Sequence, residues 1–182
     1  MADAARSAGL TEYHRPRLLE LRSHDRSDFD CGEPVLDEWL RRYAGQNRRG
    51  NTAATWVIVD EHDVVAAYAS LSMTAVDNSA ALAALAKGSP ILIPALLVGR
   101  LGVDRRHSGQ GLGTALIAHV LALVVELNQQ VACRAVVVTA INERSRHWWE
   151  RFGFSPLDPA DPEGLDLFLI TADLEATLQR LP

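Results

Sequence analysis

One segment constrains the fold of this 182-residue chain more than any other. In it, an apolar run, a loop with glycine at every second position and an amphipathic stretch follow one another directly. The run Leu96–Val103 is apolar except for Arg100, which is typical of a central strand. The loop carries its glycines at positions 109, 111 and 113. From Leu112 to Leu127 the apolar residues recur at helical spacing. The sequence therefore predicts a strand, a tight loop and a helix in succession.

The glycine loop is suited to hold an anion, because glycine lets the backbone approach a ligand and the free N–H groups of a helix N-terminus point at negative charge. Two nucleotide-binding motifs fit it poorly. A P-loop requires Lys after its last glycine, whereas Thr114 follows Gly113 here. A dinucleotide-binding fold requires G-x-G-x-x-G and an acidic residue about 20 positions later, and neither is present. A pyrophosphate loop is the functional interpretation, and a purely structural turn is the alternative.

The remaining segments predict an α/β (α+β) arrangement. The polar link 60–63 between two β-branched runs predicts an antiparallel hairpin, and Asn142 is suited to cap a helix that reaches about Phe152. Pro94 is expected to precede the central strand. Further strands are predicted at 16–22, 54–59, 64–73, 135–140 and 165–170, and a short helix at 79–87. Because hairpin and crossover connections both occur, we expect a mixed sheet.

Size and composition favour one globular domain, 16–182, preceded by a flexible N-terminus over 1–15. No apolar run approaches the ~20 residues needed to cross a bilayer, and the first eleven residues lack the apolar core of a secretory signal. We therefore expect a cytoplasmic protein. Cys31 and Cys133 have no neighbours at metal-ligand spacing, so no metal site is predicted and both are expected to be small buried residues.

The segment after Pro34 predicts a helix with one buried face. Its apolar residues lie at i, i+3, i+4 and i+7: Leu36, Trp39, Leu40 and Tyr43. The net charge of −5 argues against bulk affinity for nucleic acid, yet no acidic residue occurs from 39 to 59. That stretch contains a cluster of basic residues: Arg41, Arg42, Arg48 and Arg49. The cluster is either a solvated surface or a local anion-binding patch.

Two motifs in this chain resemble those of the GCN5-related N-acetyltransferase (GNAT) superfamily. Its acyl-CoA signature, R/Q-x-x-G-x-G/A, is matched in its glycines by Ser108–Gly113, although Ser108 stands where Arg or Gln is usual. Asn142–Phe154 looks like the family helix N-x-x-A-x-x-x-Y-x-x-x-G-F. The resemblance implies the GNAT fold, in which a twisted, mixed and mostly antiparallel sheet is flanked by helices.

Two further stretches are similar to the TacT-like toxin branch of this superfamily, which belongs to bacterial toxin–antitoxin systems. They are Ser27–Gly32 with the helix that follows it, and Val98–Arg106. This resemblance implies transfer of an acetyl group from acetyl-CoA to a primary amine, the α-amino group of aminoacyl-tRNA, which blocks translation. It also implies a ribbon-helix-helix antitoxin and a homodimer.

The resemblance assigns roles to individual residues. The backbone of Leu101, Gly102 and Val103 would bind the pantetheine arm of acetyl-CoA, and Asn142 would contact that arm or simply cap its helix. The pyrophosphate would be held by the loop, which comprises Ser108, Gly109, Gln110, Gly111, Leu112, Gly113 and Thr114. Arg105 and Arg106 would add charge beside it or flank it in solvent. tRNA would contact Arg41, Arg42, Arg48, Arg49 and Arg100.

Trp149 is the main departure from the family pattern, because it occupies the position of the tyrosine that protonates the leaving thiolate. An indole N–H donates a hydrogen bond but is no acid at neutral pH. Three interpretations follow. Trp149 positions the thiol while water supplies the proton; Ser145, four residues earlier on the same helical face, supplies it; or the protein binds acyl-CoA without turnover. A small amine or a protein N-terminus is an alternative acceptor.

Overall fold

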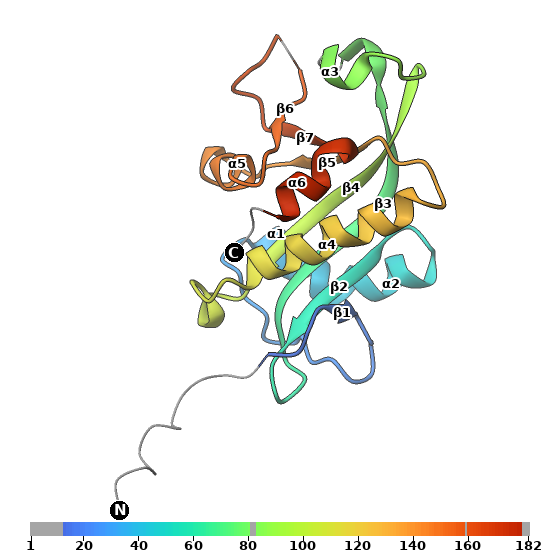
Figure 1. Cartoon of the computed structure of the whole chain (residues 1–182). Helices are drawn as coiled ribbons and strands as arrows, with labels where there is room; N and C mark the ends of the chain where they lie inside the picture. The colour runs from blue at the N-terminus through green and yellow to red at the C-terminus, as the bar shows by residue number, and fades with distance from the viewer. Residues whose placement is uncertain (1–12, 81–82, 159, 180–182) are drawn as a thin grey trace, which may run out of the picture.

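This computed structural model describes residues 13–80, 83–158 and 160–179. In that part of the chain, seven strands pair into one sheet (Figure 1). Their order is β1-β2-β3-β4-β5-β7-β6. Every neighbouring pair is antiparallel except β4 and β5, which run parallel. The predicted fold class, a mixed and mostly antiparallel sheet with flanking helices, is confirmed.

The strands and helices follow the predicted order closely. The strands are β1 Arg17–Leu18, β2 Ala54–Val59, β3 Val65–Asp77, β4 Leu92–Val103, β5 Ala135–Thr139, β6 Ser155–Pro156 and β7 Asp166–Ile170. The helices are α1 Pro34–Glu38, α2 Ala44–Arg49, α3 Ala83–Ala86, α4 Leu112–Asn128, α5 Glu143–Glu150 and α6 Leu174–Leu178. A π-helical turn, Trp39–Tyr43, joins α1 to α2, and short 3₁₀ turns cover Asn78–Ala80, Arg105–His107 and Thr171–Asp173. Two elements were not predicted: β6, which has only two residues, and the C-terminal helix α6.

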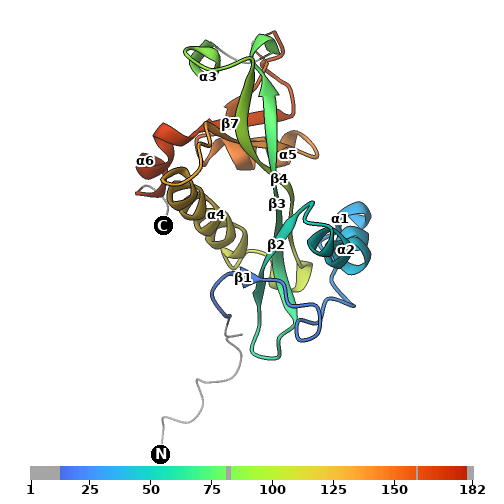
Figure 2. The ribbon, with the colours of Figure 1, turned by 90° about the vertical axis from the view of Figure 1, so that its right-hand side faces the viewer.

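The sheet has helices on both faces. α4 and α6 pack on one face, while α1 and α2 cover the other (Figure 2). The apolar stripe of α4 is buried, as its spacing predicted, against side chains from β2, β3, β4 and β5. The second core, beneath α1 and α2, is centred on Tyr68, whose hydroxyl donates a 2.8 Å hydrogen bond to the carbonyl of Leu36. No helix of the described residues is long and apolar enough to cross a membrane.

β3 and β4 are longer than predicted and form a hairpin that projects beyond the rest of the sheet (Figure 1). Pro94, expected to precede β4, lies inside it and pairs with Ala75. Its carbonyl accepts from the N–H of Arg134, and a residue's N–H and carbonyl point to the same side of a strand. The missing N–H therefore faces the side where β5 has not yet begun, so Pro94 removes no ladder hydrogen bond.

The prediction that Tyr43 is buried is wrong. Leu36, Trp39 and Leu40 lie in the core as expected, but Tyr43 is 45% exposed. The reason is the π-helical turn, which adds residues to one turn and shifts every later side chain around the axis. Ala44 occupies the core position instead and is fully buried.

The first residues of the chain, 1–12, lie outside the described part, and they make up most of the N-terminus predicted to be flexible. The last residues of the predicted N-terminal segment, 13–15, lie within the described part and contact the β2–β3 hairpin. Tyr13 forms a β-bridge with Asp60, and the N–H of His14 donates to the carbonyl of Val59 at 2.9 Å.

β4 and β5 separate soon after they pair. Their parallel ladder covers only three residue pairs, from Ala95 with Ala135 to Leu97 with Val137. β5 continues to Thr139 against β7, while β4 continues to Val103 with no partner on that side. A β-bulge at Gly99 bends β4 at this point, since Arg100 pairs with Ser70 but Val98 pairs with Leu71. The sheet therefore opens between the two strands.

Candidate active site

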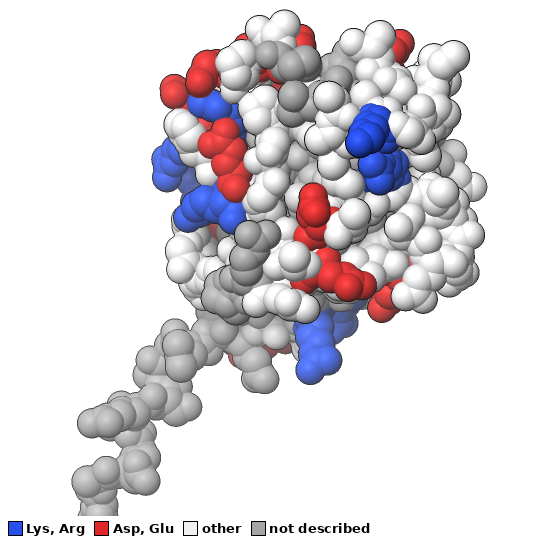
Figure 3. Space-filling model, turned by 45° about the horizontal axis from the view of Figure 1, so that its top comes forward, with Lys and Arg blue, Asp and Glu red and all other residues white. Residues whose placement is uncertain are grey.

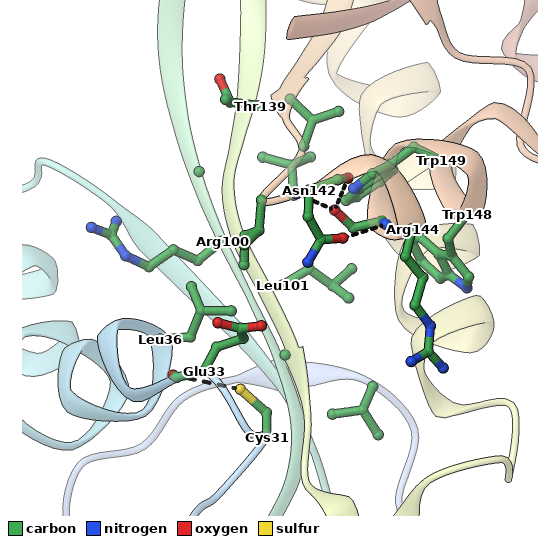
Figure 4. A pocket seen from close by; sticks show the side chains of 17 residues that line it. Cys31, Glu33, Leu36, Arg100, Leu101, Thr139, Asn142, Arg144, Trp148 and Trp149 are labelled. Carbon is green, nitrogen blue, oxygen red and sulfur yellow. Dashed lines mark hydrogen bonds between the residues drawn. The ribbon is translucent and has the colours of Figure 1, made fainter. Parts of the chain in front are cut away.

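A cavity of about 350 Å³ fills the opening between β4 and β5 (Figure 4). Its walls come from the turn before α1, the free edge of β4, the end of β5 and the first turns of α5. The lining residues are Cys31, Glu33, Leu36, Val98, Gly99, Arg100, Leu101, Gly102, Val103, Val138, Thr139, Ile141, Asn142, Arg144, Ser145, Trp148 and Trp149. The cavity brings together Leu101–Val103, Asn142, Ser145 and Trp149, which the sequence analysis had placed in one site.

The free edge of β4 is packed tightly from behind. A Cβ atom on Gly102 would lie 3.1 Å from Tyr68 and 3.3 Å from the sulfur of Cys31, so only glycine fits there without displacement. Since β4 has no strand partner beyond Leu97 on its β5 side, backbone groups of this edge remain available to an extended ligand. An amide-containing chain could lie along it as a strand would.

The loop after β4 has the geometry of an anion cradle. Gly109 and Gly111 have φ of +77° and +78°, the left-handed region that glycine adopts freely, and a Cβ on either would meet nothing within 4 Å. Gly111 is the N-cap of the 17-residue helix α4, whose first N–H groups have no intrahelical acceptor. Gly113 instead permits close packing, because its Cβ would lie 3.3 Å from Trp148 and 3.4 Å from Val103. These features fit a pyrophosphate.

The two arginines before the loop are engaged in ion pairs. Arg106 donates to both carboxylate oxygens of Asp104, at 2.9 and 2.7 Å, and Arg105 pairs with Asp30. Burial alone would raise the pKa of Asp104, but the hydrogen bonds from Arg106 outweigh it and hold that pKa below its usual value. The Arg105–Asp30 pair ties the end of β4 to the turn before α1.

Tyr13 reaches the loop from the N-terminal segment. Its hydroxyl donates a 2.6 Å hydrogen bond to Oε1 of Gln110 and lies 2.9 Å from Nδ1 of His107. A phenol has one proton, which Gln110 receives, so Nδ1 of His107 must be the donor in the second bond. The side chain of Gln110, a predicted donor-binding residue, is thus held from outside the loop.

Helix α5 begins with the predicted N-cap. The side-chain oxygen of Asn142 accepts from the N–H of Ser145 at 2.9 Å. The hydroxyl of Ser145 accepts from the N–H of Asn142 and donates to its carbonyl, which completes a capping box. The single hydroxyl proton of Ser145 is therefore committed to the backbone.

Trp149 lies at the α5 wall of the cavity and is only 4% exposed. Its ring makes edge contacts with Trp148 and Phe154, at centroid distances of 4.9 and 5.1 Å. Its N–H donates to no group in the described part of the chain, so it is available to a ligand. His147, two residues earlier, is exposed and does not line the cavity.

The cavity lacks a ready acid among the described residues. The hydroxyl of Thr139 donates to Asp166 at 2.6 Å. Burial raises the pKa of the Cys31 thiol to about 12, so this half-buried cysteine stays protonated and is a poor proton donor. With Ser145 bonded to the backbone, none of these three groups has a proton readily given to a thiolate.

Comparison with known proteins identifies the family. The profile of the acetyltransferase (GNAT) family matches residues 16–154, which is most of the chain. The chain belongs to the GNAT acetyltransferase family. It is 30% identical to the tRNA-acetylating toxin of Mycobacterium tuberculosis over 169 residues, which cover 93% of this chain and 99% of that protein.

Two solved structures of the toxin AtaT resemble this GNAT protein closely. AtaT with acetyl-methionyl-tRNAfMet superposes with a TM-score of 0.81 at 25% identity, covering 91% of this chain and 98% of that one. A tyrosine-to-phenylalanine variant of AtaT, bound to acetyl-CoA and the C-terminus of the antitoxin AtaR, gives a TM-score of 0.76 at 25% identity, covering 93% and 99%. This GNAT protein is thus related to tRNA-acetylating toxins in sequence and in fold.

The predicted tRNA-binding arginines of this GNAT protein lie outside the cavity, with one exception. Arg41, Arg42, Arg48 and Arg49 are all exposed on the π turn and α2. Arg41 and Arg48 each donate to a backbone carbonyl, and Arg42 pairs with Glu38 at 3.1 Å. Arg100 lines the cavity, but its guanidinium extends toward α1 and α2 and lies 4.6 Å above the ring of Trp39 (Figure 4).

Charge is dispersed on the face around the tip of the β3–β4 hairpin. Figure 3, which looks toward the tip of the β3–β4 hairpin, shows small separate groups of basic and acidic side chains and no continuous basic area. This face therefore offers no alternative to the arginine cluster on the π turn and α2 for contacts with phosphates.

Several cavity residues were missed by sequence reasoning: Cys31, Glu33, Thr139, Arg144 and Trp148. Cys31 and Glu33 precede α1 and lie more than 70 residues before the glycine loop, so no local spacing linked them to it. The stretch Ser27–Gly32 had been singled out for its resemblance to toxins, and its position at the cavity gives that resemblance a structural meaning.

Proposed function

We propose that this protein transfers the acetyl group of acetyl-CoA to the α-amino group of aminoacyl-tRNA and so acts as the toxin of a toxin–antitoxin pair. The observation that carries the proposal is the free β4 edge, which leads into a left-handed glycine loop at the N-terminus of α4. Membership of the GNAT family and likeness to tRNA-acetylating toxins support the same conclusion.

Acetyl-CoA, when bound, supplies the acetyl thioester. The edge Leu101–Val103 would hold its pantetheine arm through backbone hydrogen bonds, and the loop Ser108–Thr114 would hold its pyrophosphate. The side-chain oxygen of Asn142 accepts the hydrogen bond that caps α5. Its amide nitrogen makes no hydrogen bond in the described chain and would reach the pantetheine arm. Arg105 and Arg106 would fix the position of the loop through their ion pairs with Asp30 and Asp104.

The chemistry requires a neutral amine, a polarised carbonyl and a proton for the departing thiolate. Trp149 would donate its free N–H to the sulfur and stabilise negative charge there, while water delivers the proton. Between the two side chains considered for this step, Trp149 is favoured because the proton of Ser145 is bonded to the backbone of Asn142.

tRNA would dock on the arginine cluster of the π turn and α2, with Arg100 at the entrance to the cavity. A guanidinium group can donate two parallel hydrogen bonds to one phosphate, which suits contact with a nucleic-acid backbone. We further propose that the protein is a homodimer in the bacterial cytoplasm and that a ribbon-helix-helix antitoxin neutralises it. The AtaT structure with the antitoxin AtaR supports an antitoxin partner.

A second candidate function is binding of acyl-CoA without turnover, and Trp149 in place of the family tyrosine favours it. A GNAT acting on a small amine or a protein N-terminus is the other alternative. Incubation of the purified protein with labelled acetyl-CoA, charged tRNA, free amino acid amides and N-terminal peptides separates these functions. We expect label on the amino acid released from tRNA; tight CoA binding with no labelled amine would support the second candidate.

A further inference from the structure

Glu33 is the one carboxylate among the described residues that line the cavity. It precedes α1, and Figure 4 shows its side chain extending from that turn into the space between Leu36 and Leu101. The carboxylate makes no hydrogen bond or ion pair with any described residue, and it does not cap α1. Glu33 is an exposed residue, so its carboxylate is solvated and open to a cation that enters the cavity.

The basic residues around Glu33 are turned elsewhere. Arg100 lies against Trp39, and Arg105 pairs with Asp30. The guanidinium of Arg144 lies on the opposite side of the cavity from Glu33 (Figure 4). Because these groups are engaged or remote, the negative charge of Glu33 is directed at whatever enters the cavity.

We propose that Glu33 binds the ammonium group of the acceptor and removes its proton. This inference rests on the proposed function, because it concerns the acceptor of the same site. An α-amine has a pKa of about 7.7–8.0, so at pH 7 most acceptor molecules are ammonium ions that cannot attack a carbonyl. A carboxylate at the cavity both attracts that cation and accepts its proton.

Two protons are released and one is consumed in the transfer. Glu33 takes the first when the ammonium becomes an amine, and the nitrogen lone pair then forms the N–C bond. The second leaves the nitrogen after attack, as the C–S bond breaks and its electron pair goes to sulfur. Water can carry this second proton to the thiolate, so no acidic side chain is needed beside Trp149. Glu33 returns the first proton to solvent.

The test compares Glu33→Gln with the wild type in transfer of labelled acetyl groups to tRNA charged with a mixture of amino acids. We expect kcat/KM for charged tRNA to fall by about 10²-fold at pH 7. The deficit should shrink above about pH 8, where solvent deprotonates the α-amine. KM for acetyl-CoA, calorimetric affinity for CoA and the unfolding midpoint should not change, because Glu33 makes no contact that the substitution removes.

Glu61→Gln is the matched control. Glu61 lies on the turn between β2 and β3, is exposed and does not line the cavity. It should leave the rate and its pH dependence unchanged. Equal activity of Glu33→Gln and the wild type from pH 6 to 9 would overturn the proposal, and so would a deficit that stays constant with pH.

The wild type reports on the proposed function separately. If it labels only another amine, such as glycinamide, the proposed acceptor is wrong, and the ratio of Glu33→Gln to wild type on that amine still decides the role of Glu33. If the wild type labels no amine, the proposed function and the role of Glu33 are both overturned.

Discussion

The hydroxyl group of Ser145 exchanges two hydrogen bonds with the backbone of Asn142, accepting from its N–H at 3.1 Å and donating to its carbonyl at 2.9 Å. We predict that Ser145→Ala lowers the free energy of unfolding by about 1 kcal/mol, as loss of a cap does, while acetyl transfer stays within a few-fold of the wild type. Urea unfolding and initial rates measure the two effects. A loss of activity above a hundredfold without a loss of stability would make Ser145 the proton donor.

Trp149→Phe should lower kcat by about tenfold, because it keeps the ring but removes the N–H that would stabilise the leaving sulfur by roughly 1.4 kcal/mol. Trp149→Tyr should add a basic limb to the pH–rate profile near pH 10, the ordinary pKa of a phenol, that the wild type lacks. Both are measured by steady-state kinetics. A rise of orders of magnitude in Trp149→Tyr would show that the natural protein is catalytically impaired.

Gly111→Ala should weaken CoA binding by tenfold or more, since its Cβ would project into the open space of the proposed pyrophosphate loop. Gly88→Ala is the matched control. Gly88 has a similar φ of +73° and equally open surroundings but lies far from the loop. Both substitutions should cost about 1–2 kcal/mol of stability, as expected of a left-handed non-glycine residue. Calorimetry that finds equal CoA affinity in the two variants would contradict the assignment.

Arg48→Gln and Arg49→Gln should weaken tRNA binding in all tRNAs alike and reduce the slope of log K against log salt by about 0.7–0.9 per lost phosphate contact. The free energy of unfolding should change little in Arg49→Gln, whose side chain makes no hydrogen bond in the described chain. Lys87→Gln, on the distant hairpin, serves as the control. An unchanged salt slope in both arginine variants would remove this surface from the tRNA site.

His119 makes stability dependent on pH. Burial lowers its pKa below the usual value, with a smaller opposing effect of Glu126, and its Nε2 has no partner among the described residues. The unfolded chain therefore binds a proton below about pH 6.5 that the folded chain does not, so stability falls as pH drops through that range. His119→Phe retains a ring against Trp56. Its unfolding midpoint should decrease less between pH 7.5 and pH 5.5 than that of the wild type. An equal decrease in both proteins would show that His119 does not cause the pH dependence.

The strand, loop and helix around the glycines could be predicted from the sequence because each depends on local pattern. Apolar runs, left-handed glycines and the Asn142 cap all act within a few residues. The extension of β4 through Pro94 could not, since the tolerance of a proline there depends on where β5 begins. The π turn that exposes Tyr43 was missed because helical spacing assumes a regular helix.

The residues proposed to bind acetyl-CoA were singled out from the sequence, whereas Glu33, proposed to act on the acceptor, was not. Gly109 to Thr114 lie a few residues after β4, so the pattern that suggests their joint role is visible in one stretch of chain. Glu33 and Arg144 come from two separate turns, and only the separation of β4 from β5 brings them to one cavity. The bond that commits Ser145 is local, and the capping pattern with Asn142 would have revealed it.

The central claim is transfer of an acetyl group to aminoacyl-tRNA, and one measurement tests it most directly. Total tRNA charged with all amino acids is incubated with the protein and labelled acetyl-CoA, and the amino acids released by mild base are identified by mass spectrometry. We predict N-acetyl amino acids in the wild-type reaction and a large reduction with Glu33→Gln. Free α-amines on every released amino acid, with CoA binding intact, would contradict the account.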